Sequence, residues 1–260
     1  MQLPLFPLHT VLCPGIALPL HIFEERYREL VQYCIETPSP FGVVLIREGQ
    51  DAGGGSIAFS AIGTTAEIRR AGRYPDGRYD LLVVGTGRFA IEEVTVGERP
   101  YILAEATLLD DEVSDQDEAR RLANLATRRF VRYLELLQPR DGESTEEIDI
   151  SVEVETEDAD AEGEPGVGAM AETIGEVEVE QGDETVRRRV VIPDDPTTLS
   201  YLLAGIIQIE LPRRQALLES ETTDERLRDL LALIDRETFL LRRRLRAFIP
   251  TPASLGKRGS

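Results

Sequence analysis

The sequence has no tryptophan, two cysteines and one lysine among its 260 residues. Two cysteines cannot build the disulfide framework of a small secreted protein, so the cysteine count favours a reducing compartment, the cytoplasm. Long apolar runs are also missing, because the longest, Leu199 to Ile209, has about half the length that a bilayer requires. We therefore expect no membrane-spanning segment. A secretory signal is not expected either, because no Lys or Arg precedes Arg26 and four prolines interrupt the N-terminal stretch.

Basic residues are absent from one long segment. Residues 141–185 contain 18 Asp and Glu and no Lys or Arg. The whole chain has 48 acidic and 29 basic residues. The chain outside residues 141–185 therefore has 30 acidic and 29 basic residues and is nearly neutral. With 42% hydrophobic and 30% charged residues the chain is globular in composition, so only local disorder is expected. The acidic insertion, residues 141–193, is predicted to be disordered or to form a projecting hairpin, because Ile148, Ile150, Val152 and Val154 alternate with acidic and polar residues.

Two kinds of periodicity divide the rest of the chain. Residues 1–112 show short period-two patterns punctuated by Gly and Pro, which are typical of β-strands. One helix, Glu24 to Ile35, interrupts them. Strands are expected at residues 3–8, 17–22, 41–47, 60–70, 79–85, 88–96 and 101–110. Residues 113–140 and 194–250 have helical periodicity and form the helical part, and the tail, residues 251–260, is expected to be disordered.

Helix boundaries in the second half carry specific signals. Asp195 and Pro196 are suited to the N-cap and first positions of one helix, and Pro212 starts another. Thr222 with Glu225 three residues later is a candidate capping box for a last helix that runs to Phe248. Its apolar residues have heptad spacing, which fits either a core-facing bundle helix or an intermolecular coiled coil. The wide apolar stripe favours the bundle.

An ordered series of short motifs resembles the N-terminal domain of Lon proteases. The motifs are residues 3–8 (LPLFPL), 11–15 (VLCPG), 18–27 (LPLHIFEERY), 62–64 (IGT), 66–68 (AEI), 75–78 (PDGR), 84–89 (VGTGRF) and 100–101 (PY). The helical part, with residues 215–218, 226–227 and the last helix, continues the similarity. The sequence departs from the family in its long acidic insertion. It also carries neither the phosphate-binding GxxxxGK[ST] motif nor room for the Ser–Lys protease pair.

The resemblance implies an α+β fold, with a PUA-like β pseudo-barrel and one helix followed by a helical bundle. It also implies a module, not an enzyme, that recognises unfolded or exposed polypeptide segments and works in protein quality control with a separate ATPase or protease. No catalytic residue, metal or cofactor is assigned. As peptide-binding residues we select Phe23, Arg26, Tyr27 and Arg28, although Phe23 and Tyr27 could instead be core residues. The acidic insertion could compete for this surface or repel acidic clients.

Two other motifs have simpler explanations. Residues 85–90 fit the GxGxxA pattern of dinucleotide-binding loops, but the following residues continue as a strand, so a glycine hairpin is expected instead. Residues 158–163 resemble the start of a calcium loop but lack its last carboxylate.

His9, Cys13, His21 and Cys34 have no metal-ligand spacing, and Cys13 as a nucleophile lacks an orienting acid. Arginine clusters are scattered rather than gathered in one patch, so the sequence does not favour nucleic acid as a partner. An RNA-binding module and a thiol or metal enzyme remain the alternatives.

Overall fold

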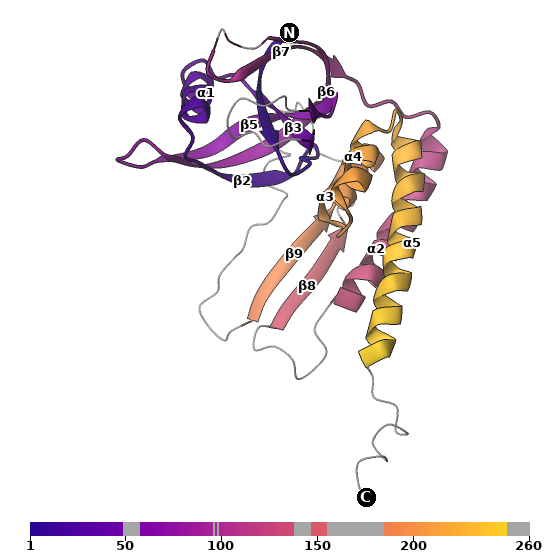
Figure 1. The fold of residues 1–260 in the computed structure, drawn as a ribbon. Helices are drawn as coiled ribbons and strands as arrows, with labels where there is room; N and C mark the ends of the chain where they lie inside the picture. The colour runs from indigo at the N-terminus through magenta and orange to yellow at the C-terminus, as the bar shows by residue number, and fades with distance from the viewer. Residues whose placement is uncertain (49–57, 96, 98, 138–146, 155–184, 249–260) are drawn as a thin grey trace, which may run out of the picture.

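A computed structural model describes residues 1–48, 58–95, 97, 99–137, 147–154 and 185–248. The first half is a sheet with one helix, α1 (Glu25–Glu36) (Figure 1). Its strands are β1 (Gln2–Leu8), β2 (Ala17–Ile22), β3 (Phe41–Glu48), β4 (Ala58–Phe59), β5 (Ile62–Arg73), β6 (Tyr79–Thr95) and β7 (Ile102–Leu109). The order and type of these elements follow the period-two and helical patterns of the sequence.

Five strands close into a ring. The sheet has the order β1-β7-β6-β5-β3-β4, and β1 pairs with β7 on one side and with β3, in parallel, on the other. A sheet closed in this way is a barrel, which confirms the expected α+β pseudo-barrel. β2 lies outside the ring and, among the described strands, pairs only with the first part of β6, so β2, β6 and β5 form a three-stranded extension of the barrel wall.

β6 differs from the prediction. The sequence suggested two strands joined by a glycine hairpin at residues 85–87, but β6 is one continuous strand of 17 residues. Gly85 is needed for another reason, since a Cβ atom there would lie 2.5 Å from the carbonyl oxygen of Cys13. Gly85 therefore lets the loop before β2 pack directly on β6, and the glycines at 85 and 87 form neither a turn nor a nucleotide-binding loop.

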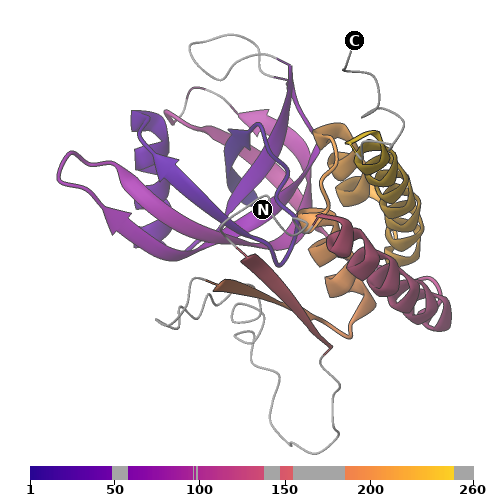
Figure 2. The same ribbon diagram turned by 90° about the horizontal axis from the view of Figure 1, so that it is seen from below.

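The second half is helical, with α2 (Gln116–Leu137), α3 (Pro196–Ile206), α4 (Leu211–Glu219) and α5 (Thr223–Phe248) (Figures 1 and 2). The Asp195 carboxylate accepts a hydrogen bond of 2.7 Å from the Thr198 amide, which confirms the predicted N-cap of α3. The hydroxyl of Thr222 accepts one of 3.3 Å from the Glu225 amide at the start of α5. Leu227 and Ile234 are fully buried in the core that α5 shares with α2 and α3, as expected for a bundle helix.

One apolar core joins the two halves. Val11, Cys13 and Leu45 of the barrel belong to the same buried cluster as the helical core residues. A Cβ atom on Gly205 of α3 would lie 2.6 Å from the side chain of Ile16, so this helix lies directly against the barrel loop. The two halves are therefore packed together rather than linked flexibly.

Two strands of the acidic insertion are described. β8 (Glu147–Val154) and β9 (Thr185–Ile192) pair in parallel, from Glu147 opposite Thr185 to Val154 opposite Ile192. A hairpin requires antiparallel strands, so the hairpin expectation was wrong for this pair. The segment between these strands and the tail, both expected to be disordered, lie outside the described residues. The calcium-like residues 158–163 lie outside them too.

Candidate functional site

The three-stranded extension has one side covered and one side open. Tyr79, Leu81 and Val83 of β6 point to the covered side, where they pack with Tyr27, Leu30, Val31 and Cys34 of α1. The alternate residues point the other way. On that open side Pro19 of β2 and Arg70 of β5 flank Leu82, and His21 and Gly72 flank Asp80. We call this surface the outer face. Its residues are Pro19, His21, Phe23, Arg70, Tyr74, Asp80 and Leu82.

Aromatic side chains gather at the end of the outer face. Phe23 is 62% exposed and Tyr74 41% exposed. The His21 ring lies between them, 6.3 Å from the Phe23 ring in a stacked arrangement and 6.2 Å from the Tyr74 ring in an edge arrangement. The guanidinium of Arg78 lies 5.4 Å from the Tyr74 ring centre. The result is an exposed surface of rings and cations, a composition suited to binding apolar and aromatic side chains.

Hydrogen bonds hold this cluster in place. The His21 Nδ1 atom lies 2.6 Å from an Asp80 carboxylate oxygen, and the Tyr74 hydroxyl donates to the other oxygen. Both hydrogen bonds lower the pKa of Asp80, and the bond from Tyr74 has the larger effect. The same bond raises the pKa of Tyr74. The carboxylate therefore stays charged and keeps both rings oriented at neutral pH.

The turn between β5 and β6 adds a fixed edge to the outer face. The Tyr74 amide donates to the Arg78 carbonyl at 2.9 Å, and Gly77 adopts a φ of 86°, which side chains with a Cβ rarely accept. Asp76 accepts hydrogen bonds from the Arg78 amide and side chain, which lower its pKa. Arg28 of α1 donates to the Asp76 carbonyl at 3.3 Å, so the first turn of α1 holds the tip of the hairpin.

The four residues selected from sequence separate into two environments. Phe23 lies on the outer face, and Arg28 is half-buried at the hairpin tip. Tyr27 is only 5% exposed and packs 4.2 Å from the Phe6 ring in the core. Arg26 is half-buried, with its guanidinium 4.5 Å from the Tyr27 ring and 2.8 Å from Glu24. Of the four, Phe23 is thus the side chain best placed to touch a partner.

Sequence reasoning missed the partners of Phe23. Tyr74, Arg78 and Asp80 are more than 50 residues away from it in the chain, and only the pairing of β2 with β6 brings them together. Strand alternation would have placed His21 and Phe23 on one face, which was the available signal. The register with β6 could not be derived from composition.

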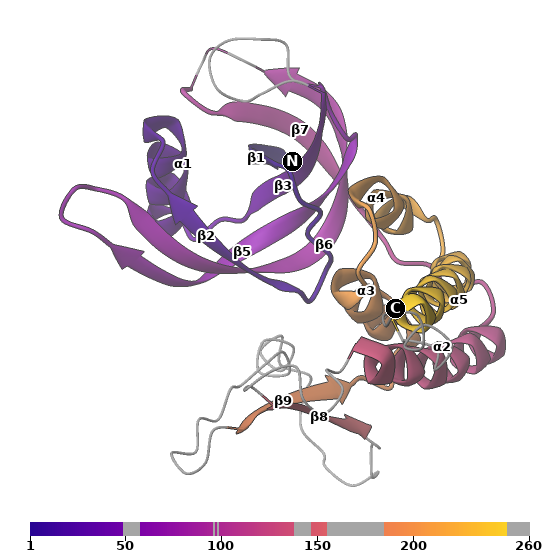
Figure 3. The same ribbon diagram turned by 60° about the horizontal axis from the view of Figure 1, so that its bottom comes forward.

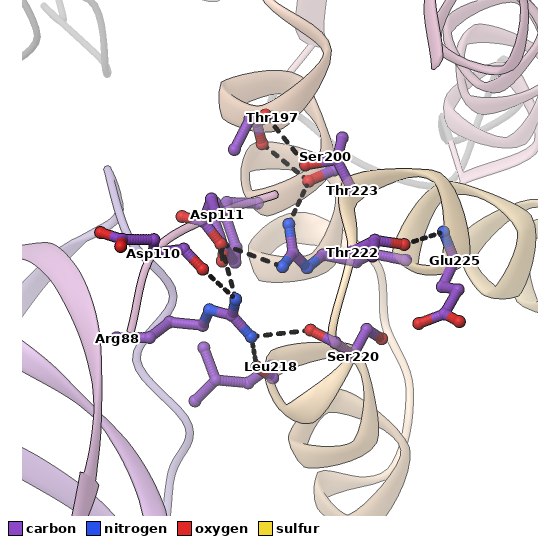
Figure 4. A network of polar contacts seen from close by, with 12 residues as sticks. Arg88, Asp110, Asp111, Thr197, Ser200, Leu218, Ser220, Thr222, Thr223 and Glu225 are labelled. Carbon is purple, nitrogen blue, oxygen red and sulfur yellow. Dashed lines mark hydrogen bonds and ion pairs between the residues drawn. The ribbon is translucent and has the colours of Figure 1, made fainter. Parts of the chain in front are cut away.

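A second polar site lies where the barrel meets the helices (Figure 4). Arg88 of β6 is 3% exposed and donates hydrogen bonds to the carbonyls of Leu218, Ser220 and Asp110. Arg226 of α5 is fully buried and donates to the Leu217 carbonyl and the Ser200 hydroxyl. Both arginines therefore tie backbone ends of different elements together.

One carboxylate joins the two arginines. Asp111 lies 2.9 Å from Arg88 and 3.2 Å from Arg226, and it accepts a hydrogen bond from the Tyr201 hydroxyl. The Arg226 guanidinium also lies over the Tyr201 ring, 3.9 Å from its centre. Burial lowers the pKa of Arg226 and raises that of Tyr201, so Tyr201 stays a neutral phenol that donates its hydrogen bond to an Asp111 side-chain oxygen. Among the described residues Arg88 Nε has no hydrogen-bond partner, but the terminal nitrogens of both arginines, the Asp111 carboxylate and the Tyr201 hydroxyl bond within the protein, which makes this a structural junction rather than a binding site.

The residues considered for metal or thiol chemistry are dispersed. Cys13 lies in the core shared with the helices, Cys34 is on the buried side of α1, and His21 is on the outer face. Burial raises the pKa of both thiols to about 11, so neither is a thiolate nucleophile at neutral pH. In the part of the chain that the structure describes, no group of three or more His, Cys, Asp or Glu side chains could hold a metal ion. No described helix is both long and apolar enough to span a membrane.

The fold is α+β, a closed barrel with one helix followed by helices that end in the long α5. Residues 2–236 match the family described as the ATP-dependent protease La (LON) substrate-binding domain, and the chain belongs to that family. The expected resemblance is thereby confirmed.

Similar proteins and solved structures agree with this assignment. The chain is 31% identical over 126 residues to a Lon protease of Flavobacterium johnsoniae, covering 48% of this chain and 15% of that protein. It is 24% identical over 239 residues to one from Azorhizobium caulinodans, covering 92% and 23%. A Lon N-terminal domain protein from Xanthomonas campestris has the same fold, with a TM-score of 0.55, 24% identity and coverage of 89% of this chain and 98% of that one. The chain thus spans less than a quarter of the length of these Lon proteases.

Proposed function

We propose that the chain binds exposed, poorly folded polypeptide segments through its outer face and breaks no bond in them. The observation that carries this proposal is Phe23, a large apolar side chain that is 62% exposed and held in an ordered ring cluster. Contact of an apolar aromatic ring with water is unfavourable, and a binding partner that covers the ring removes this contact. Membership of a substrate-binding family supports a polypeptide as that partner.

The physical mode follows from the cluster. A client side chain that packs against Phe23 and His21 loses contact with water, while Arg78 and Tyr74 offer polar contacts at the rim. Arg28 fixes the hairpin tip, and the buried Tyr27 and the half-buried Arg26 stack on each other at the first turn of α1. Aromatic and arginine residues in such arrangements contribute most of the free energy of many protein interfaces.

Catalysis falls outside this proposal. The matched family is the substrate-binding part of Lon proteases, so ATP hydrolysis and peptide-bond cleavage would belong to a separate ATPase or protease. In that arrangement the chain would act in protein quality control by presenting clients.

Two variants with the same exposed area test the proposal. Phe23 and Phe239 are both 62% exposed, but Phe239 lies on α5 of the helical half. We expect Phe23→Ala to weaken binding of fluorescent, reduced and carboxymethylated α-lactalbumin about tenfold, which corresponds to about 1.4 kcal/mol. Phe239→Ala should stay within about twofold of the unmodified protein.

Fluorescence anisotropy at low and high salt provides the measurement. Binding through apolar contacts should persist at high salt, whereas binding of an RNA oligonucleotide would fall steeply. Equal affinities of the two variants would contradict the assignment of the outer face. Failure of the unmodified protein to bind the unfolded probe would contradict the proposed function itself.

A further inference from the structure

One edge of the three-stranded extension has no partner strand in the described residues. β5 pairs with β6 along its length, but its pairing with β3 reaches only to Ala66, opposite Phe41. Residues Glu67 to Arg73 therefore present a free edge, which at about 3.4 Å per residue is roughly 23 Å long. Figure 3 shows this hairpin projecting away from α2, α3, α4 and α5. An open edge of this length can accept another strand of about six residues.

The turn fixes which backbone groups face outward. The Tyr74 amide bonds to the Arg78 carbonyl, and hydrogen-bonded pairs alternate with non-bonded pairs along an antiparallel ladder. Gly72 opposite Asp80 is thus a hydrogen-bonded pair, whereas Arg73 opposite Tyr79 and Ala71 opposite Leu81 are not. The amide and carbonyl groups of Ala71 and Arg73 consequently point to the free edge.

The edge is basic, whereas the chain outside residues 141–185 is nearly neutral and the whole chain has a formal net charge of −19. Arg69, Arg70 and Arg73 are all exposed along it, and Glu67 is its one acidic residue. Arg69 lies 3.4 Å from Glu67, and the Arg73 guanidinium lies 5.7 Å from the Tyr79 ring. Arg70 has no ion pair within the part of the chain that the structure describes. A strand added here would place its alternate side chains beside Arg70 on the outer face and beside Arg73 on the opposite face.

We propose that this edge, residues Glu67 to Arg73, receives an extended acidic polypeptide segment as an added strand. The inference rests on the proposed function and narrows its clients to segments in which acidic residues alternate with apolar ones. The outward amide and carbonyl groups of Ala71 and Arg73 supply hydrogen bonds, and the three arginines select acidic over basic segments. Charged residues on an edge also prevent sheets from aggregating. If the arginines had only that role, the edge would bind no acidic segment.

The probe is a capped, fluorescein-labelled peptide of about eight residues in which valine and glutamate alternate. Ala71→Pro removes an outward amide but leaves the hydrogen bonds to β6 intact, because proline is tolerated on an edge strand. Ala71→Val is its matched control, since it keeps the amide. We expect Ala71→Pro to weaken binding at least about fivefold and Ala71→Val to change it less than about twofold.

Charge is tested separately. Arg70→Glu should weaken binding of the glutamate peptide about tenfold, and a peptide with lysine in place of glutamate should not bind. Hydrogen exchange on the unmodified protein gives a readout independent of folding defects, because the Arg73 amide should become protected when the peptide binds. If Ala71→Pro fails to fold, Arg70→Glu and this protection decide the question.

The outcomes separate the two proposals. If the unfolded probe binds but the glutamate peptide does not, the edge inference is overturned. The same holds if Ala71→Pro, Arg70→Glu and the unmodified protein bind the peptide equally. In both cases the proposal that the outer face binds polypeptides is unaffected. If neither the unfolded probe nor the peptide binds, the proposed function fails as well. Peptide binding with both variants impaired and Arg73 protected supports the inference.

Discussion

Replacing Asp111 by asparagine should destabilise the protein substantially. Its carboxylate is the only acidic side chain within ion-pair distance of the two arginines that lie between the barrel and the helices, within the described residues. Those arginines, Arg88 and Arg226, are 3% and 0% exposed. Asp111→Asn preserves size but leaves two buried positive charges near each other without compensation. Removal of one partner of a buried ion pair typically costs about 3–5 kcal/mol.

The expected loss is near the lower end, about 3 kcal/mol, for two reasons. Asp111 itself is 25% exposed, so water screens part of the interaction, and backbone carbonyls and a hydroxyl still accept hydrogen bonds from both arginines. A domain has a total stability of about 5–15 kcal/mol, so this loss is a large share. For a protein of this size it corresponds to a fall in Tm of roughly 6–12 °C.

Urea unfolding followed by far-ultraviolet circular dichroism measures this loss, with thermal melting as a second readout. Asp110→Asn is the matched control, because the neighbouring Asp110 contributes only its backbone carbonyl to Arg88. We expect the control to stay within about 0.5 kcal/mol of the unmodified protein. If Asp111→Asn also stayed within that range, the reasoning that the junction depends on a shared carboxylate would be refuted.

Three further substitutions or titrations test other parts of the fold. Gly85→Ala should lower the free energy of unfolding by about 2 kcal/mol or more, because its Cβ atom would lie 2.5 Å from a backbone oxygen. Gly87→Ala should lower it clearly less, because the nearest atom to its Cβ would lie at 3.7 Å. Equal melting temperatures of the two variants would contradict this reasoning. The pKa of the Cys13 and Cys34 thiols is raised from 9.0 to about 11, so both thiols stay protonated in the folded protein at pH values where they ionise in the unfolded chain. Their stabilising contribution is complete below pH 9 and is lost as the pH rises toward 11, at about 2–3 kcal/mol per thiol. A double Ala variant should lose that slope in pH-dependent unfolding, and fast labelling by a thiol reagent in the native state at pH 8 would argue against the burial. Asp195→Ala removes the N-cap of α3 and should lower the free energy of unfolding by about 1 kcal/mol, and an unchanged urea midpoint would show that the cap contributes nothing.

Elements with a clear period or cap were predictable from sequence. The strand Ala17–Ile22 and the start of α5 at Thr223 were expected with those bounds, because alternation and a capping residue are local signals. The continuous β6 was missed because glycines in a strand look like a turn until the close packing of Cys13 is known. The parallel pairing of β8 with β9 was missed because alternation does not specify strand direction.

The functional surface was predictable only in part. Phe23 was selected from its motif, and the structure places it on the outer face, but Tyr74 and Arg78 reach it through strand pairing across distant parts of the chain. The buried arginines were missed for a related reason. The sequence shows only scattered arginine clusters, and no local signal indicates that Arg226 pairs with Asp111, 115 residues earlier.

Hydrogen exchange measured by mass spectrometry on the full chain, with and without a saturating amount of reduced, carboxymethylated α-lactalbumin, tests the central claim most directly. The account predicts slower exchange in peptides that cover residues 17–23 and 69–80, and unchanged exchange in α2 and α5. Protection confined to the helical half, with the barrel extension unaffected, would contradict it.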